Sequence, residues 1–322
     1  MGSTVVVNGA EAYREALTRV PLDRGAVGTT GGAVRELSAG GGLFDEDGGE
    51  HRGSRRAVAE GLGAAGVERL RPVWRAVLDR RLAPLAAGQD VDVVALAREM
   101  AGATVCALLG VTAPPEAVAE AASAAAAAAV RAELPGLRRA FAGRRAARAA
   151  ARLTSLLGPE GLPAVLAVAG VNTTVAAVPR AAAWCADAGW WGYAEAAGTR
   201  AVLVSELLRA TAPSPVLPRV AAADAELGGC PVRRGDRLLL VARHAVLAHR
   251  KPPDVRDPAP PAVAHLVFGA GSHACPGARL ARAQTDDVLA ALAPYRPVVV
   301  RARVDRRAAL PGWRTLVLRS GR

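Results

Sequence analysis

One segment near the C-terminus restricts this chain more than any other, because it places a single cysteine in a glycine-rich loop directly before a helix. The segment, residues 268–282, reads Phe-Gly-Ala-Gly-Ser-His-Ala-Cys-Pro-Gly-Ala-Arg-Leu-Ala-Arg. Glycine lacks a Cβ, so the backbone can bend tightly around Gly269, Gly271 and Gly277 and aim N–H groups at the Cys275 sulfur. The sequence therefore predicts a loop that presents one thiolate to a bound metal.

The neighbours of this cysteine are those expected beside a haem. Phe268 can form an apolar wall that keeps water from the sulfur and sets the potential of the iron. His273, two residues before the cysteine, can reach a haem propionate. Arg279 and Arg282 fall on the first turns of the following helix, where they would present positive charge on the cysteine side. A lone cysteine is usually a small buried hydrophobe, but here the whole frame favours an iron ligand.

The segment resembles the signature of the cytochrome P450 superfamily, Phe-Gly-x-Gly-x-His/Arg-x-Cys-x-Gly followed by Leu-Ala-Arg, and every fixed position is filled. The resemblance implies a mainly α-helical fold with a small β region, in which haem b (iron protoporphyrin IX) is held by Cys275 as axial ligand of the iron. A thiolate ligand donates electron density and favours O–O cleavage. The resemblance also implies O2 as co-substrate, with electrons from a ferredoxin and its ferredoxin reductase.

A second match lies within the apolar stretch 162–178, where residues 169–174 read Ala-Gly-Val-Asn-Thr-Thr. A glycine and a hydroxyl are locally unfavourable in mid-helix, and such inconsistent spots are often functional. The stretch resembles the family motif in which the helix widens beside the haem, and Thr173 matches the hydroxyl that assists oxygen activation. Asn172 replaces the usual acid, and an amide cannot carry a proton as a carboxylate does. Gly170, Asn172 and Thr173 are the candidate catalytic residues, with ordinary helix packing as the alternative.

Two residues near the start of a predicted helix match the propionate clamp of bacterial members. His51 and Arg55 lie four residues apart, so they share one helix face. They resemble the His-x-x-x-Arg pair whose side chains bind a propionate. A solvated basic helix start is the alternative interpretation.

Glu206 and Arg209 lie three residues apart on a predicted helix and can form an ion pair. The same spacing recurs at Glu68 and Arg71, so chance alone produces it. The context is more specific than the spacing. A proline-containing break follows the pair, and Arg219 then lies at the start of a predicted strand. This order resembles the structural Glu-x-x-Arg helix of the family, followed by its propionate-contacting arginine.

The resemblance runs from about Val5 to the end of the chain, but not evenly. The stretch between Val111 and Leu162, which in the family carries the two helices that lid the substrate pocket, is compressed. In the proline-rich coil, the arginine that normally completes a Glu-Arg-Arg triad falls at Pro260, with Arg256 as the nearest substitute. Shortened lid helices predict an open distal pocket, suited to a bulky substrate or one tethered to a carrier protein.

Residues 1–322 are expected to form a single haem domain. Its parts are an N-terminal strand, helix and loop (1–50), a helical region with the shortened lid (51–160), and a region with the central helix, the Glu-x-x-Arg helix and the cysteine loop (161–322). Hydrophobic residues make up 51% of the chain, which is ample for a core. The other cysteines lack paired metal-type spacing and are expected to be inert: Cys106, Cys185 and Cys230.

The sequence pattern also predicts individual elements. A strand is expected at 5–7, a helix at 10–17, a glycine-rich loop at 25–49 and a helix beginning near residue 51. Further helices are expected at 67–85 and 91–109, and two amphipathic helices within 116–157. The apolar run 238–241 after Arg-Gly-Asp suggests a hairpin, and prolines between 252 and 261 indicate an irregular coil.

The net charge of +12 can indicate nucleic-acid binding. No basic run interleaved with aromatic residues accompanies it, which favours acidic protein partners instead. No signal peptide opens the chain, and the apolar stretch 162–178 is short for a membrane span and contains polar residues. We therefore expect a cytoplasmic protein that binds neither a membrane nor nucleic acid.

These observations favour a haem-thiolate monooxygenase that hydroxylates, epoxidises or oxidatively couples a small specialised metabolite. Asn172 and the missing coil arginine leave a second hypothesis open, a P450-like haem enzyme that uses peroxide or carries out a redox-neutral rearrangement or cyclisation. A degenerate, non-catalytic scaffold is the third hypothesis, and failure to bind haem would support it.

Overall fold

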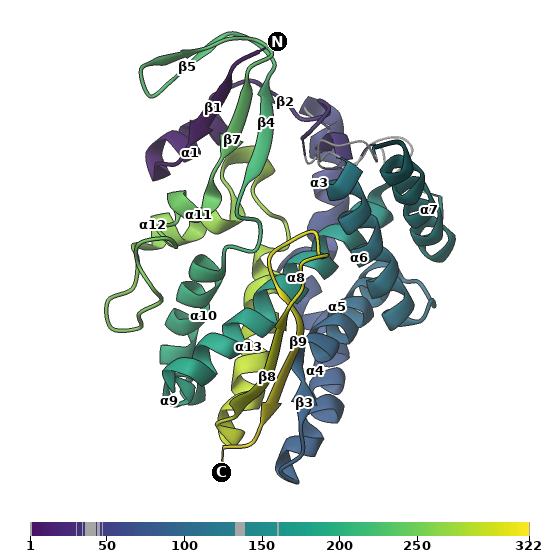
Figure 1. Ribbon diagram of the computed structural model, residues 1–322, viewed down its shortest axis with the longest axis vertical. Coiled ribbons are helices and arrows are strands. Elements are labelled where there is room, and N and C mark those ends of the chain that lie inside the picture. The colour runs from purple at the N-terminus through teal and green to yellow at the C-terminus, as the bar shows by residue number, and fades with distance from the viewer. Residues whose placement is uncertain are drawn as a thin grey trace.

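The computed structural model describes residues 2–321, apart from 30, 34, 36–42, 44, 45, 47, 133–138 and 160. About half of the predicted glycine-rich loop over 25–49 lies outside the described residues. Helices make up most of the fold, and the small amount of sheet is divided between the top of the view and its lower centre (Figure 1). In chain order the helices are α1 (Ala10–Thr18), α3 (Gly48–Leu62), α4 (Ala64–Ala86), α5 (Val93–Leu109), α6 (Pro115–Ala132), α7 (Arg139–Leu157), α8 (Gly161–Ala188), α9 (Trp191–Glu195), α10 (Ala197–Thr211), α11 (Ala242–Ala245), α12 (Pro261–Ala264) and α13 (Ala278–Leu292), with 3-10 turns η1 (His265–Phe268), η2 (Gly271–His273) and η3 (Ala293–Tyr295).

The helix predictions at 10–17, 67–85 and 91–109 are confirmed within a few residues. The last of these helices begins at Val93 rather than at residue 91, because Asp92 acts as its N-cap. The Asp92 carboxylate accepts a hydrogen bond from the Val94 N–H at 2.9 Å, which satisfies one of the free donors of the first turn. The expected compressed lid region contains α6 and α7, so both helices are present.

The strands are β1 (Thr4–Val7), β2 (Leu22–Asp23), β3 (Val91–Asp92), β4 (Leu217–Ala221), β5 (Ala225–Leu227), β6 (Cys230–Val232), β7 (Arg237–Leu240), β8 (Val298–Val304) and β9 (Trp313–Arg319). Among the described residues they form a four-stranded sheet of order β1-β7-β4-β2, a three-stranded sheet of order β3-β9-β8, and the pair β5-β6. The coil predicted between 252 and 261 is confirmed, since neither helix nor strand occurs there before Pro261.

The hairpin predicted at 238–241 is wrong. β7 lies inside the four-stranded sheet, where it pairs in parallel with β1 and antiparallel with β4. The hairpin lies one element earlier, between β5 and β6, where Gly228 and Gly229 take the positive φ angles that a tight turn needs. The apolar run of β7 reflects burial instead, because Leu238 and Leu240 have no exposed surface.

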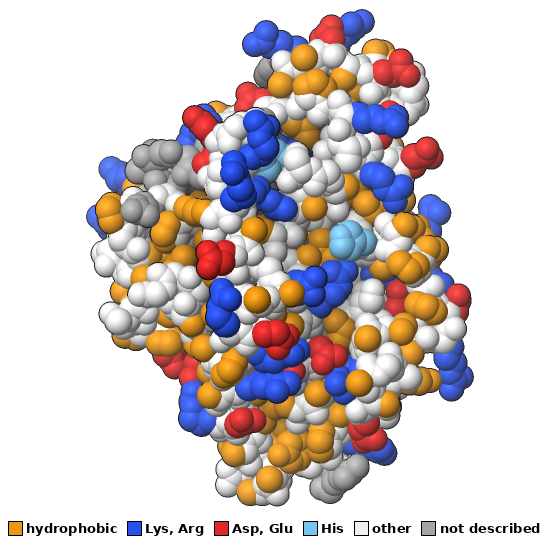
Figure 2. All heavy atoms as spheres, turned by 180° about the vertical axis from the view of Figure 1, so that it is seen from behind, with side chains coloured by type: hydrophobic (Ala, Val, Ile, Leu, Met, Phe, Trp, Pro, Cys, Tyr) orange, Lys and Arg blue, Asp and Glu red, His pale blue; other side chains and the backbone are white. Residues whose placement is uncertain are grey.

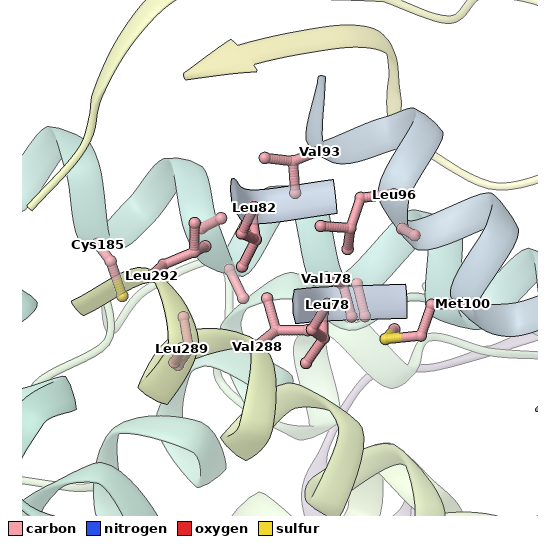
Figure 3. Packing of buried hydrophobic residues seen from close by; sticks show 14 of the residues in the cluster. Leu78, Leu82, Val93, Leu96, Met100, Val178, Cys185, Val288, Leu289 and Leu292 are labelled. Atoms are coloured by element: carbon pink, nitrogen blue, oxygen red, sulfur yellow. The ribbon is translucent and has the colours of Figure 1, made fainter. Parts of the chain in front are cut away.

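The largest part of the core lies where α4, α5, α8 and α13 meet (Figure 3). Leucine, valine and methionine side chains from all four helices point into one apolar layer, as expected for helices that each bury one stripe. The labelled members are Leu78, Leu82, Val93, Leu96, Met100, Val178, Cys185, Val288, Leu289 and Leu292. This packing holds α8 against α13, the helix that follows the cysteine loop.

A buried polar contact reinforces the junction of α4 and α13. The Asp287 carboxylate of α13 accepts hydrogen bonds from Arg71 Nε (2.9 Å), Trp74 Nε1 (2.8 Å) and Arg75 Nη2 (2.8 Å) of α4. Burial acts to raise the pKa of Asp287, but these donors outweigh it and lower the pKa. The contact therefore fixes the position of the helix that follows Cys275.

Helix α8 runs through the middle of the fold. By length and composition it is the one described helix that could cross a membrane, with a mean hydropathy of 1.7 over its most apolar window. In the fold it packs against α5, α6 and α10 and buries residues along its length. We interpret α8 as a core helix.

Cys185 in α8 gives a prediction about alkaline stability. Burial raises the pKa of its thiol from an ordinary 9.0 to about 12. Between these two values the unfolded chain loses the proton while the native chain keeps it, so stability falls as pH rises, by about 1.4 kcal/mol per pH unit. In denaturant titrations, the stability difference between the natural protein and Cys185→Ala should stay constant from pH 6 to 8 and shrink above pH 9. A constant difference up to pH 11 would contradict this.

Candidate functional site

The cysteine loop is folded as its glycines predicted. The Cys275 N–H donates a hydrogen bond to the Phe268 carbonyl oxygen at 2.8 Å, which closes the loop between η1 and α13. Gly271 has a φ of +72°, and a Cβ there would lie 3.2 Å from Thr18 Cγ2 and 3.3 Å from the Leu17 carbonyl oxygen. Only glycine combines that backbone angle with such close packing on α1.

The environment of the Cys275 sulfur suits a metal ligand. Part of the surface of Cys275 is exposed, but its thiol is surrounded by protein. This burial is the main influence on the thiol and raises its pKa. The Gly277 N–H and the positive charges of Arg55 and Arg282 act in the opposite direction. The raised pKa favours the protonated thiol, and a metal cation bound at this sulfur would displace that proton.

Phe268 lies between the loop and α13. The Arg282 guanidinium carbon lies 4.4 Å from the centre of the Phe268 ring, which is cation–π geometry. Burial lowers the pKa of Arg282, and the nearby Cys275 sulfur opposes that shift. The ring thus holds one of the two predicted cationic residues close to the sulfur. The other, Arg279, is exposed.

The structure brings the predicted His-x-x-x-Arg pair onto the cysteine loop, although more than 200 residues separate them in the sequence. Helix α3 begins at Gly48, so His51 and Arg55 lie on its first two turns. The His51 ring stacks on the His273 ring with a centroid distance of 3.8 Å. Arg55 Nη1 donates a hydrogen bond to the Ala274 carbonyl oxygen at 2.6 Å. Three donors proposed for haem propionates are therefore grouped beside the cysteine.

Arg219 lies in β4, as predicted, and is 9% exposed. Burial, and after it the positive charge of Arg24, lower the pKa of its guanidinium to about 10. β2 pairs with β4 through Leu22 and Asp23, so Arg24 follows the last paired residue and comes close to Arg219. Burying two like charges side by side destabilises the folded chain. A bound anion such as a propionate would offset this repulsion, so the two arginines suit an anion site.

Sequence reasoning missed Arg24. It belongs to no motif and directly precedes the predicted glycine-rich loop. The signal that identifies Arg24 is the antiparallel register of β2 on β4, which becomes available only with the fold. Its side chain is 8% exposed, which is unusual for an arginine.

The motif of α8 is present as a continuous helix. Thr173 Oγ1 donates to the Ala169 carbonyl oxygen at 2.7 Å. Asn172 Nδ2 donates to the carbonyl oxygens of Val168 (2.7 Å) and Ala122 (3.3 Å), so the amide also connects α8 to α6. A Cβ added at Gly170 would make only an ordinary contact of 3.5 Å, to Val105, so packing does not require glycine there.

Glu206 and Arg209 form a fully buried ion pair, with side-chain exposures of 1% and 0%. Arg209 donates from Nε to Oε1 at 3.0 Å and from Nη2 to Oε2 at 2.7 Å. The same carboxylate accepts the N–H groups of Asp254 (3.2 Å) and Ala259 (3.0 Å). Arg209 also donates to three carbonyl oxygens, those of Val246, Lys251 and Pro252. The predicted ion pair is confirmed, and it anchors the proline-rich coil.

The suggestion that Arg256 substitutes for the missing triad arginine is wrong. Arg256 Nε donates to the Tyr193 hydroxyl at 3.0 Å, on the surface. The Glu206 carboxylate already accepts four hydrogen bonds, two from Arg209 and two from the backbone N–H groups of Asp254 and Ala259. Backbone donors therefore replace the side chain that Pro260 cannot supply.

The residues present fit a haem. Cys275 stands in a glycine-shaped loop near an aromatic ring, and the cationic or imidazole side chains of His51, Arg55 and His273 lie beside this loop. These side chains match the negative charge of haem propionates. Helix α8, which carries Thr173, packs directly against α13. The predicted motif of α8 therefore lies on a helix that adjoins α13, the helix that follows the cysteine loop.

Comparison of sequences agrees with this site. No protein-family profile matches the chain. A cytochrome P450 of Mycobacterium bovis is 35% identical over 127 residues, covering 37% of this chain and 28% of the relative. The 2-hydroxy-5-methyl-1-naphthoate 7-hydroxylase of Streptomyces carzinostaticus is 42% identical over 82 residues, covering 24% of this chain and 20% of that protein. The chain thus matches less than a third of the length of each of these relatives.

Comparison of folds extends over nearly the whole chain. P450BioI, solved in complex with an acyl carrier protein that carries hexadec-9Z-enoic acid, superposes with a TM-score of 0.78 at 18% identity, covering 98% of this chain and 91% of that chain. The mycinamicin VIII C21 methyl hydroxylase MycCI of Micromonospora griseorubida gives 0.74 at 23% identity, covering 98% and 90%. The predicted mainly α-helical fold with a small β region is confirmed. The chain is therefore similar in sequence to cytochrome P450s over part of its length, and it has the fold of solved cytochrome P450 structures over nearly all of it.

Proposed function

We propose that this protein is a haem-thiolate monooxygenase that oxidises a small specialised metabolite. The observation that carries the proposal is the cysteine loop, in which Cys275 is held by a hydrogen bond to Phe268 and flanked by His273 and the α3 residues His51 and Arg55. Haem b bound through the Cys275 thiolate supplies iron-centred activation of O2. Arg219 and Arg24 add positive charge for a propionate.

Thr173 and Asn172 differ in what they can do with a proton. Thr173 donates its only hydrogen to Ala169, so its oxygen remains free to accept a hydrogen bond and can order a water molecule on that face of α8. Asn172 uses its amide nitrogen on two carbonyl oxygens. An amide in that arrangement holds the helix in place but cannot transfer protons, so water ordered by Thr173 is the proposed proton source.

The names of similar proteins support a class of substrate. One relative is named as a 2-hydroxy-5-methyl-1-naphthoate 7-hydroxylase, one structural neighbour is a mycinamicin VIII C21 methyl hydroxylase bound to mycinamicin VIII, and another is in complex with an acyl carrier protein. We propose a small or carrier-bound metabolite as substrate, a ferredoxin with its reductase as electron source, and a cytoplasmic location. The basic surface supports an acidic partner: Lys and Arg side chains are spread over the face in Figure 2, with a group of them beside a histidine.

The proposal is tested with labelled oxygen. The haem-loaded protein is supplied with ferredoxin, reductase, NADPH and hexadecenoyl-acyl carrier protein as probe under 18O2. Incorporation of one labelled oxygen atom is the expected result, with loss of incorporation when reductase is omitted. Product formation that needs only hydrogen peroxide and carries no label from O2 would favour the second candidate instead, a peroxide-dependent enzyme. The bonding of Asn172 to two carbonyl oxygens is the observation that keeps this candidate open.

A further inference from the structure

Three arginines from distant parts of the chain meet at one place outside the haem region. Arg131 lies at the end of α6, Arg145 in α7, and Arg307 in the loop between β8 and β9. They line a recess of about 280 Å3, and among the described residues its lining contains no carboxylate. Figure 1 shows the β8–β9 loop extending past α8 toward α6. We call this site the arginine recess.

The arginine recess is held in place by bonds of its own. The Arg131 guanidinium donates to the Arg307 carbonyl oxygen, which connects α6 to the β8–β9 loop. The Asp305 carboxylate accepts the N–H groups of Arg307 at 2.8 Å and Ala308 at 3.2 Å, which folds the start of that loop. These bonds hold the Arg131 side chain against the backbone of Arg307, and α6 packs along α7, the helix that carries Arg145.

The same loop leads from the arginine recess to the proposed catalytic part of α8. A Cβ added at Gly312, at the end of the loop, would lie 3.6 Å from Ala176 Cα and 4.0 Å from the Val175 carbonyl oxygen. These residues are within one helical turn of Thr173. The Asp305 N–H donates to the Gly312 carbonyl oxygen at 3.0 Å, so the base of the loop that carries Arg307 lies against the helix that carries Thr173.

We propose that the arginine recess binds the phosphate of a phosphopantetheine arm, the flexible group that tethers an acyl chain to a carrier protein. Guanidinium groups bind phosphate in a bidentate manner, and adjacent positive charges repel one another until an anion joins them. A phosphate held at the recess would let the tethered chain extend along the loop toward Thr173. The inference rests on the proposed function, because it assigns a binding site to a carrier-bound substrate of that enzyme.

Calorimetric titration of the haem-loaded protein at low ionic strength tests this inference, with 4′-phosphopantetheine and pantetheine as the two probes. The phosphorylated probe should bind about tenfold more tightly or better, since a hydrogen bond to a charged group contributes at least that much. Arg145→Gln and Arg307→Gln should each remove this preference. Arg148→Gln, an exposed arginine one turn further along α7, is the matched control and should keep it. Circular dichroism checks that each variant is folded.

Three results would overturn the inference: equal binding of the two probes, an equal loss in Arg148→Gln, or binding of ADP or inorganic phosphate as tight as that of 4′-phosphopantetheine. The last would mean a site for free phosphates rather than for the arm. The carbon monoxide spectrum of the same preparation separates this test from the proposed function. A protein without the thiolate spectrum that still prefers 4′-phosphopantetheine through Arg145 and Arg307 would contradict the monooxygenase and support the recess.

Discussion

Replacing Glu206 by alanine is expected to lower the free energy of unfolding by about 3–5 kcal/mol, because the change leaves the Arg209 charge buried without its carboxylate. Both side chains are almost completely buried, and the carboxylate also holds the backbone N–H groups of Asp254 and Ala259. Loss of Glu206 therefore also releases the proline-rich coil that precedes the cysteine loop. Denaturant titration measures the effect, and reduced haem retention should accompany it.

The chain offers a matched control with the same spacing on its surface. Glu68 pairs with Arg71 at 2.9 Å, but the Glu68 side chain is 61% exposed. Glu68→Ala should change the free energy of unfolding by at most about 1 kcal/mol, as exposed ion pairs do. Comparable losses in the two variants would contradict a structural role specific to the buried pair.

The double variant His51→Ala/Arg55→Ala is expected to release haem at least about tenfold faster than the natural protein, since each hydrogen bond to a charged group contributes about 1.5–3 kcal/mol. These residues meet the cysteine loop at His273 and Ala274. Transfer of haem to an excess of apomyoglobin, followed by absorbance, gives the rate. Arg55→Lys keeps the positive charge, so its rate of haem release should lie between those of the natural protein and the double variant.

Arg52→Ala is the control for this measurement. Arg52 lies in the same helix, one residue from His51, and is exposed. Its removal changes the net charge as much as removal of Arg55 does, so a purely long-range electrostatic effect would appear in both variants. Unchanged haem release in the double variant, or an equal acceleration in Arg52→Ala, would contradict the assignment of His51 and Arg55 to the propionates.

The sequence predicted the parts of the site that depend on local spacing. The cysteine loop, the His51 and Arg55 pair and the Glu206 and Arg209 pair each lie within a few residues, so their mutual geometry follows from one turn or one helix face. The structure confirms that the first two come together. It also confirms the burial of the third pair. The catalytic roles of Gly170, Asn172 and Thr173 remain predictions.

Features that depend on long-range pairing could not be predicted in this way. β7 was misassigned to a hairpin because an apolar run after a turn does not reveal which strands lie beside it, here β1 and β4. Arg24 became a candidate only through the register of β2 on β4. At Glu206, backbone N–H groups take the place of a triad arginine. Backbone groups are the same in every sequence, so no residue type could have indicated this replacement.

The central claim is that Cys275 is the axial ligand of a haem iron, and the absorption spectrum of the reduced protein under carbon monoxide tests it most directly. The spectrum is recorded for the natural protein and for Cys275→Ala, with haem content measured in parallel. We predict the red-shifted Soret band typical of thiolate ligation in the natural protein and its loss in the variant. Absence of haem from the natural protein, or an identical spectrum in Cys275→Ala, would contradict the account.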